Sequence, residues 1–182
     1  MSSDTGDVLG RLFERRLVMA HGRLDSGLAD TITAQLITLD AEGDEPIELL
    51  IDCPESELDA AFTVLDVCEA LGAPLTISVA GRLTGAGIAL LTSRHRRTGR
   101  PHATLQISEP KFETSMPGTA ETIARLVEEH RRRIGVLIER ISERTTRPEP
   151  LIADDMSRGI YLTSDAAVTY GLLDDVVRRA PA

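Results

Sequence analysis

One stretch of the sequence, residues 79–91 (VAGRLTGAGIALL), combines the residue types of a hydrolase active-site turn. A β-type apolar run leads through glycines into an apolar helix, and many hydrolases present a nucleophilic serine at such a strand-to-helix turn. The stretch contains a single hydroxyl, that of Thr84, and it is followed by Gly85. The turn is therefore of the right type for a nucleophile, although it holds no serine or cysteine.

The four histidines are the side chains that could act as general bases near neutral pH. His102 shares strand parity with Ser108, but six residues of about 3.3 Å each would separate them by about 20 Å in an unbroken strand. His21, His95 and His130 fall in a strand-end loop, a basic helix end and a long helix. We expect each of these three to be a solvated surface residue.

The two cysteines carry no sign of metal or redox chemistry. Cys53 falls at a strand end and Cys68 on an apolar helix face, with neither CxxC spacing nor a histidine neighbour. This pattern predicts buried structural thiols. We expect no metal and no cofactor.

Apolar periodicity predicts the elements that must position these residues. Strands and helices alternate with short links, which indicates an α/β fold with a parallel sheet covered by helices and right-handed crossovers. The predicted strands are 17–20, 46–52, 74–81 and 103–108, and the predicted helices are 27–42 with Ser26 as N-cap, 56–71, and 86–94, which should be buried.

Beyond Pro110 the pattern changes to a loop or extended segment (111–118) and then one long amphipathic helix of about 25 residues (119–146). The apolar stripe along such a helix needs a surface to pack against, either in the helix's own domain or on a second subunit. A short helix near 151–156, a helix capped by Ser164 and a tail strand complete the chain. The stripe consists of Ile123, Leu126, Val127, Ile134, Leu137, Ile138 and Ile141.

The composition narrows the class of protein. The chain has 182 residues, 42% of them hydrophobic and 27% charged, with a formal net charge of −9. A charge of this sign argues against non-specific binding to nucleic acid or to anionic membranes. No apolar run approaches the roughly 18 residues of a membrane span, so we expect a cytoplasmic protein with no membrane and no nucleic-acid partner.

Several segments together resemble ClpP, the proteolytic subunit of the Clp protease. The resemblance runs from about Leu12 to Val177, through LFERRLVMAHGRLDSGLADTITAQLITLDAEGDEPIELLIDCP, ISVAGRLTGAGIALL, LQISEP and YLTSDAAVTYGLLDDVV. It implies a ClpP/crotonase-like ββα spiral with a protruding handle helix. It also implies a single domain over 1–182, with a head at about 12–110 and 147–182 and a handle at about 111–146.

The same resemblance implies a Ser-His-Asp triad at three positions of this chain. Gly85 stands at the serine position and Ser108 at the histidine position, while Asp155 keeps the acid. Glycine has no atom that can attack a carbonyl, and a serine hydroxyl cannot act as a general base near neutral pH. Thr84 precedes the nucleophile position by one residue. We predict that its hydroxyl serves the turn or caps the helix, and the alternative is that it acts as the nucleophile.

The oxyanion region departs from the family pattern as well. The family's SPGG is replaced by CPES, which places Glu55 and Ser56 at the two glycines. A carboxylate near that spot would oppose the developing negative charge. Asp155, without an imidazole to orient, is predicted to be a retained capping or interface carboxylate.

Three functions follow as hypotheses. The first is a catalytically inactive subunit with a structural or regulatory role, in heptameric or tetradecameric rings with itself or with active ClpP-like paralogues. The second is a Clp-type serine peptidase with residual activity through a displaced nucleophile such as Thr84 or Ser108. The third is small-molecule or acyl-CoA binding in a crotonase-like cleft. Aromatic residues make up only 3% of the chain, which argues against pockets that accept the loops of a Clp ATPase.

Overall fold

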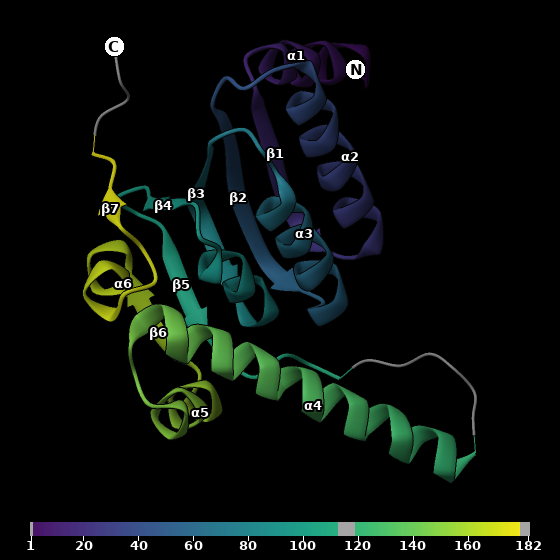
Figure 1. Cartoon of the computed structure of the whole chain (residues 1–182), viewed down its shortest axis with the longest axis vertical. Helices are drawn as coiled ribbons and strands as arrows, with labels where there is room; N and C mark the ends of the chain where they lie inside the picture. Colours follow the sequence, from purple (N-terminus) through teal and green to yellow (C-terminus); the bar gives the residue numbers. More distant parts are fainter. Residues whose placement is uncertain (1, 113–118, 179–182) are drawn as a thin grey trace.

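One seven-stranded sheet runs through the computed structural model, which describes residues 2–112 and 119–178 (Figure 1). The strand order is β1-β2-β3-β4-β7, and β5 pairs with both β3 and β6. Among the described strand pairs, only β5–β6 is antiparallel. The strands are β1 (Leu17–Leu24), β2 (Ile47–Ser56), β3 (Leu75–Thr84), β4 (Arg96–Gly99), β5 (Thr104–Ile107), β6 (Ile160–Thr163) and β7 (Asp175–Val176).

Helices flank this sheet and connect its parallel strands. Helices α2 and α3 pack against each other, and the 3-10 helix η1 packs against α3 and α4. The long helix α4 passes the end of β5 and extends well beyond the sheet (Figure 1). The helices are α1 (Ser2–Glu14), α2 (Ser26–Glu42), α3 (Leu58–Ala70), η1 (Gly85–Thr92), α4 (Ala120–Thr145), α5 (Glu149–Arg158) and α6 (Ser164–Tyr170). The expected α/β fold is confirmed.

Strand direction decides where a site can form. Along the first part of β2, fully buried residues such as Leu49 and Ile51 alternate with half-buried ones, as a strand with one core face requires. β1, β2, β3 and β5 are mutually parallel where they pair, so their carboxyl ends meet at the same edge. The end of β2, the start of η1 and the residues after β5 are thereby brought together.

Two predicted helix caps are wrong by one residue. The N-cap of α2 is Asp25, whose carboxylate accepts a hydrogen bond from the Leu28 amide at 3.0 Å. The N-cap of α6 is Thr163, whose hydroxyl accepts from the Ala166 amide at 3.2 Å. Ser164 instead is fully buried and donates to the Arg100 carbonyl at 2.6 Å, so it ties the start of α6 to the end of β4.

Other differences concern short or irregular elements. The buried segment predicted as a helix over 86–94 is the 3-10 helix η1. Helix α1 was not predicted. The four-residue strands β4 and β6 were not predicted either, because four residues carry too little periodicity to separate a strand from a loop. The predicted loop over 111–118 lies mostly outside the described residues.

The predicted long helix is confirmed as α4, which has 26 residues. Thr119 caps it by accepting from the Thr122 amide at 3.3 Å. Only the C-terminal half of the stripe packs into the core: Leu137 and Ile141 are fully buried. Ile134 and Ile138 pack partly against the core, whereas Ile123, Leu126 and Val127 are half-buried and lie outside it.

Candidate functional site

The turn between β3 and η1 has the backbone of a nucleophile turn. β3 ends at Thr84, and Gly85 begins η1 with φ of +56°, in the left-handed region that glycine adopts without strain. A Cβ atom placed on Gly85 would lie 3.7 Å from the hydroxyl oxygen of Ser108, its nearest neighbour. Positions 85 and 108 therefore face each other across the turn.

Strand pairing explains why these two positions meet. β5 runs parallel to β3 with Thr84 opposite Gln106. Ser108 follows β5 by one residue, so it reaches the edge at which the turn begins. The structure thus brings together two of the three positions that the triad pattern singled out.

Asp155 lies in α5 and is buried, with 7% of its surface exposed. The amide of Glu109 donates to the carbonyl of Met156 at 3.3 Å, which holds α5 against the segment that carries Ser108. The carboxylate of Asp155 accepts a hydrogen bond from the Tyr170 hydroxyl at 2.7 Å. Burial, followed by this hydrogen bond, holds the pKa of Tyr170 well above its usual value, so the phenol remains the proton donor.

The hydroxyl of Thr84 is engaged in structure. It donates to the Pro54 carbonyl at 2.7 Å and thereby joins β3 to β2. Thr84 does occupy the cap position of η1, but its side chain makes no capping hydrogen bond. A carbonyl oxygen accepts this hydrogen bond without being able to remove the proton, so this contact does not activate Thr84 as a nucleophile.

The two residues in place of the oxyanion glycines differ in environment. The carboxylate of Glu55 is 57% exposed and lies 3.7 Å from the Arg23 guanidinium, which offsets its charge. The hydroxyl oxygen of Ser56 is buried and finds no hydrogen-bond partner among the described residues. A Cβ on Gly87 would lie 2.7 Å from that oxygen and 2.6 Å from Leu83 Cδ1, so only glycine fits at 87 without a shift.

One cleft of about 890 Å³ lies between the edge of the sheet and α4, and it is lined by Glu55, Ser56, Thr84, Gly85 and Ser108 among others. Gly85, Ser108 and Glu109 contribute to one side, and Arg133 of α4 contributes to the other. Arg133 binds Asp59 at 3.0 Å and lies over the ring of Phe62, with its guanidinium carbon 5.3 Å from the ring centroid. This part of α4 is thus held to α3. The cleft has the size of a ligand or peptide site.

Two histidines are not the solvated residues expected from the sequence. His130 is half-buried in the cleft wall, with Nε2 3.1 Å from the Pro110 carbonyl and its ring 5.2 Å from that of Phe112. His95 is half-buried too, because its Nε2 lies 2.7 Å from the Cys68 carbonyl. The side chain of His21 is 73% exposed, and His102 is also exposed.

The spacing of His130 in the sequence contained a signal for its place in the cleft. His130 stands four residues from both Leu126 and Ile134, so it belongs to the stripe that faces inward on α4. Arg23 had no comparable signal, because its place at the cleft depends on the pairing of β1 with β2.

Among the side chains that the structure describes, no cluster of three or more His, Cys, Asp or Glu could hold a metal ion. No helix within residues 2–112 and 119–178 is long and apolar enough to cross a membrane. Both cysteines are buried and free, and burial is the main cause that raises the pKa of each to about 12.

The comparison with known families covers nearly the whole chain. A family model described as Clp protease matches residues 2–180. The chain belongs to the Clp protease family. The match spans the turn, the cleft and α4, and it confirms the ClpP-like resemblance and fold. The loss of the catalytic side chains is inferred from the residues that stand at the positions of the family's motifs, and it stays a prediction.

Proposed function

We propose that this Clp protease family chain is a catalytically inactive subunit with a structural or regulatory role in a ring-shaped, cytoplasmic Clp-type assembly. One observation carries the proposal: Gly85 and Ser108 face each other where a nucleophile and its base would meet, and neither can do that work. The cleft around them is retained.

The chemical deficit is large. A nucleophilic oxygen is missing at 85, and the neutral hydroxyl at 108 is too weak a base to accept a proton near pH 7. In a serine protease whose triad was dissected, removal of the triad costs on the order of a million-fold in rate. Asp155, bonded to Tyr170, then acts as a buried structural carboxylate.

Helix α4 supports the assembly role. Its outer half carries the stripe residues Ile123, Leu126 and Val127, which lie outside the buried core and are only half-buried. Members of this family generally form oligomeric rings, and a second subunit would bury that stripe. The subunit would thereby contribute scaffold positions without cutting.

Assembly is tested by native mass spectrometry of the chain alone and after co-expression with an active ClpP-like paralogue. We expect homomeric or mixed rings. Ile123→Asp and Leu126→Asp should dissociate them, because each would bury a charge in the contact, whereas Arg131→Asp, on the exposed side of α4, should not. A wild-type chain that stays monomeric and enters no ring would refute the assembly role.

Catalysis is tested with a fluorogenic peptide. We expect no turnover by the wild-type chain and partial recovery in the double variant Gly85→Ser/Ser108→His, since a Cβ fits at 85 and faces 108. A serine at φ of +56° costs about 1–2 kcal/mol, an acceptable strain for a nucleophile turn. Gly85→Ala/Ser108→His is the matched control and should be inactive.

The competing peptidase hypothesis makes the opposite prediction. Wild-type cleavage that is lost in Thr84→Val or Ser108→Ala would establish a displaced nucleophile and overturn the proposal. Labelling by a serine-reactive probe, with the same dependence on Thr84 or Ser108, would overturn it in the same way.

A further inference from the structure

A second hollow, of about 290 Å³, lies where the end of α3, the end of η1 and the C-terminal part of α4 meet. It shares no lining residue with the cleft described above. We call it the arginine hollow, and its lining residues are Glu69, Thr92, Arg94, Arg140, Glu143 and Arg144.

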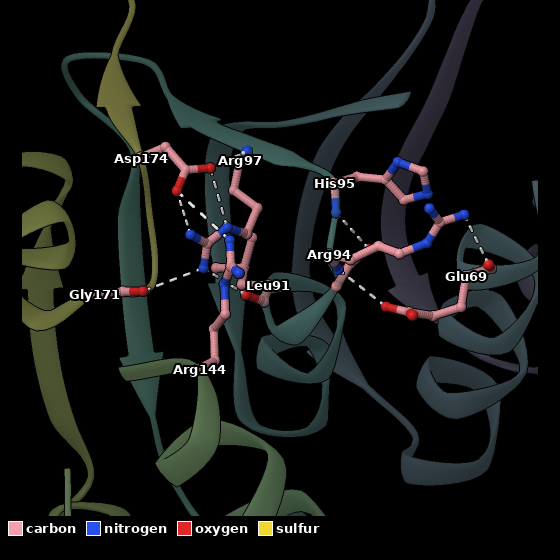
Figure 2. Close-up of polar contacts among 9 residues, drawn as sticks. Glu69, Leu91, Arg94, His95, Arg97, Arg144, Gly171 and Asp174 are labelled. Atoms are coloured by element: carbon pink, nitrogen blue, oxygen red, sulfur yellow. Dashed lines mark hydrogen bonds and ion pairs between the residues drawn. The ribbon is translucent and has the colours of Figure 1, made fainter. Parts of the chain in front are cut away.

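Positive charge is concentrated next to this hollow. Arg97 is buried and donates to both carboxylate oxygens of Asp174 and to the carbonyls of Leu91 and Gly171. Figure 2 shows Arg144 extending from α4 toward Arg97 and Asp174. Arg144 lies 3.6 Å from the same carboxylate, so two guanidinium groups share one Asp174.

Arg144 is the less well satisfied of the two. Its Nε is buried and has no acceptor among the described residues, and its contact with Asp174 exceeds hydrogen-bond distance. Burial, and then the charge of Arg97, lower the pKa of Arg144. The carboxylates of Asp174 and Glu69 act in the opposite direction, but the Nε of Arg144 still lacks an acceptor among the described residues.

Two further arginines complete the wall with fixed geometry. Arg140 donates from Nε to the Thr92 hydroxyl at 3.2 Å and lies 3.7 Å from Glu69. Arg94 donates from its guanidinium to the carbonyls of Glu69 and Leu71, both at 3.1 Å, and a neutral carbonyl does not cancel its positive charge. Guanidinium groups held in place lose little entropy when they bind an anion.

We propose that the arginine hollow binds one small tetrahedral oxyanion of the phosphate class, as free phosphate or as a phosphomonoester. Arg144 and Arg140 approach from α4, and Thr92 and Arg94 approach from the segment that ends η1. Donors from different directions suit a tetrahedral anion better than a planar carboxylate, which one guanidinium satisfies. The site is independent of the subunit's proposed role in a ring.

Calorimetric titration of the full chain with potassium phosphate, against potassium chloride at equal ionic strength, tests the site. We expect saturable binding of one phosphate per chain. Arg144→Gln should weaken it at least about tenfold, since bonds to charged groups are worth about 1.5–3 kcal/mol and about 1.4 kcal/mol is tenfold. Glu143→Gln should tighten it, because a carboxylate leaves the wall.

Arg132→Gln is the matched control, because Arg132 lies on the same helix, is exposed and pairs with Glu129 outside the hollow. It should bind phosphate as the wild type does. Arg144→Gln should fold, because Arg97 still neutralises Asp174, and circular dichroism checks this. Arg140→Gln provides a second variant with the same expected loss.

Two more titrants identify the source of the anion. Binding of phenyl phosphate as tight as that of phosphate assigns the hollow to phosphomonoesters, and binding of phosphate alone assigns it to the free ion. Acetate that binds as tightly as phosphate would overturn the tetrahedral assignment. Absence of saturable heat with phosphate, or equal affinity in the wild type and Arg144→Gln, would overturn the site.

Discussion

Arg96 and Arg97 are neighbours in β4, yet their surroundings predict very different contributions to the stability of the fold. The side chain of Arg97 is 4% exposed and that of Arg96 is 62% exposed. Arg96 reaches Asp175 at 3.7 Å, in a pair that is open to solvent. We predict that Arg97→Met is strongly destabilising and that Arg96→Met, its matched control, is nearly neutral.

The size of the effect follows from what the guanidinium of Arg97 holds. Its four hydrogen bonds join β4 to η1 through Leu91 and to the C-terminal segment through Gly171 and Asp174. Breaking a buried ion pair costs about 3–5 kcal/mol. The side chain of Asp174 is 41% exposed and keeps Arg144 as a partner, so the loss lies at the lower end of this range, about 3 kcal/mol. An exposed pair such as that of Arg96 contributes about 0–1 kcal/mol.

Thermal and urea unfolding at one fixed protein concentration measure the difference. In a chain of this length about 1 kcal/mol shifts the midpoint by about 2–4 °C, so Arg97→Met should melt about 6–12 °C below the wild type. Arg97→Lys keeps the charge but not the planar fork and should fall between them. Equal midpoints for Arg97→Met and Arg96→Met would refute the reasoning.

Two further predictions concern titratable groups. Burial alone would raise the pKa of Asp174, but the hydrogen bonds and charge of Arg97, with Arg144, outweigh it and hold the pKa below the ordinary 3.8. The stability from Asp174 is therefore present above about pH 4 and lost as pH falls through the depressed pKa, so the deficit of Asp174→Asn in urea melts should shrink below pH 4. With both thiol pKa values raised to about 12, Cys53 and Cys68 should resist Ellman's reagent at pH 8 in the native chain and react in urea. Rapid native labelling of either would show that the core opens locally.

The spacing of apolar residues predicted much of the fold, because it shows which face of a single helix or strand is buried. Residues 119–146 show a 3.6-residue repeat over many turns, and α4 forms there. The glycines after residue 80 indicated a tight turn, and Gly85 takes a left-handed φ. Boundaries were less predictable, since Asp25 and Thr163 compete with the adjacent Ser26 and Ser164 for the same capping geometry.

The absence of a nucleophile at position 85 is a property of the sequence alone, because no fold can add an oxygen to glycine. Tertiary structure decided that Ser108 faces that position, that His130 lines the cleft, and that Arg97 rather than Arg96 is buried. Each of these depends on contacts between residues far apart in the chain, set by strand pairing and helix packing. Spacing within one segment carries no information about such contacts.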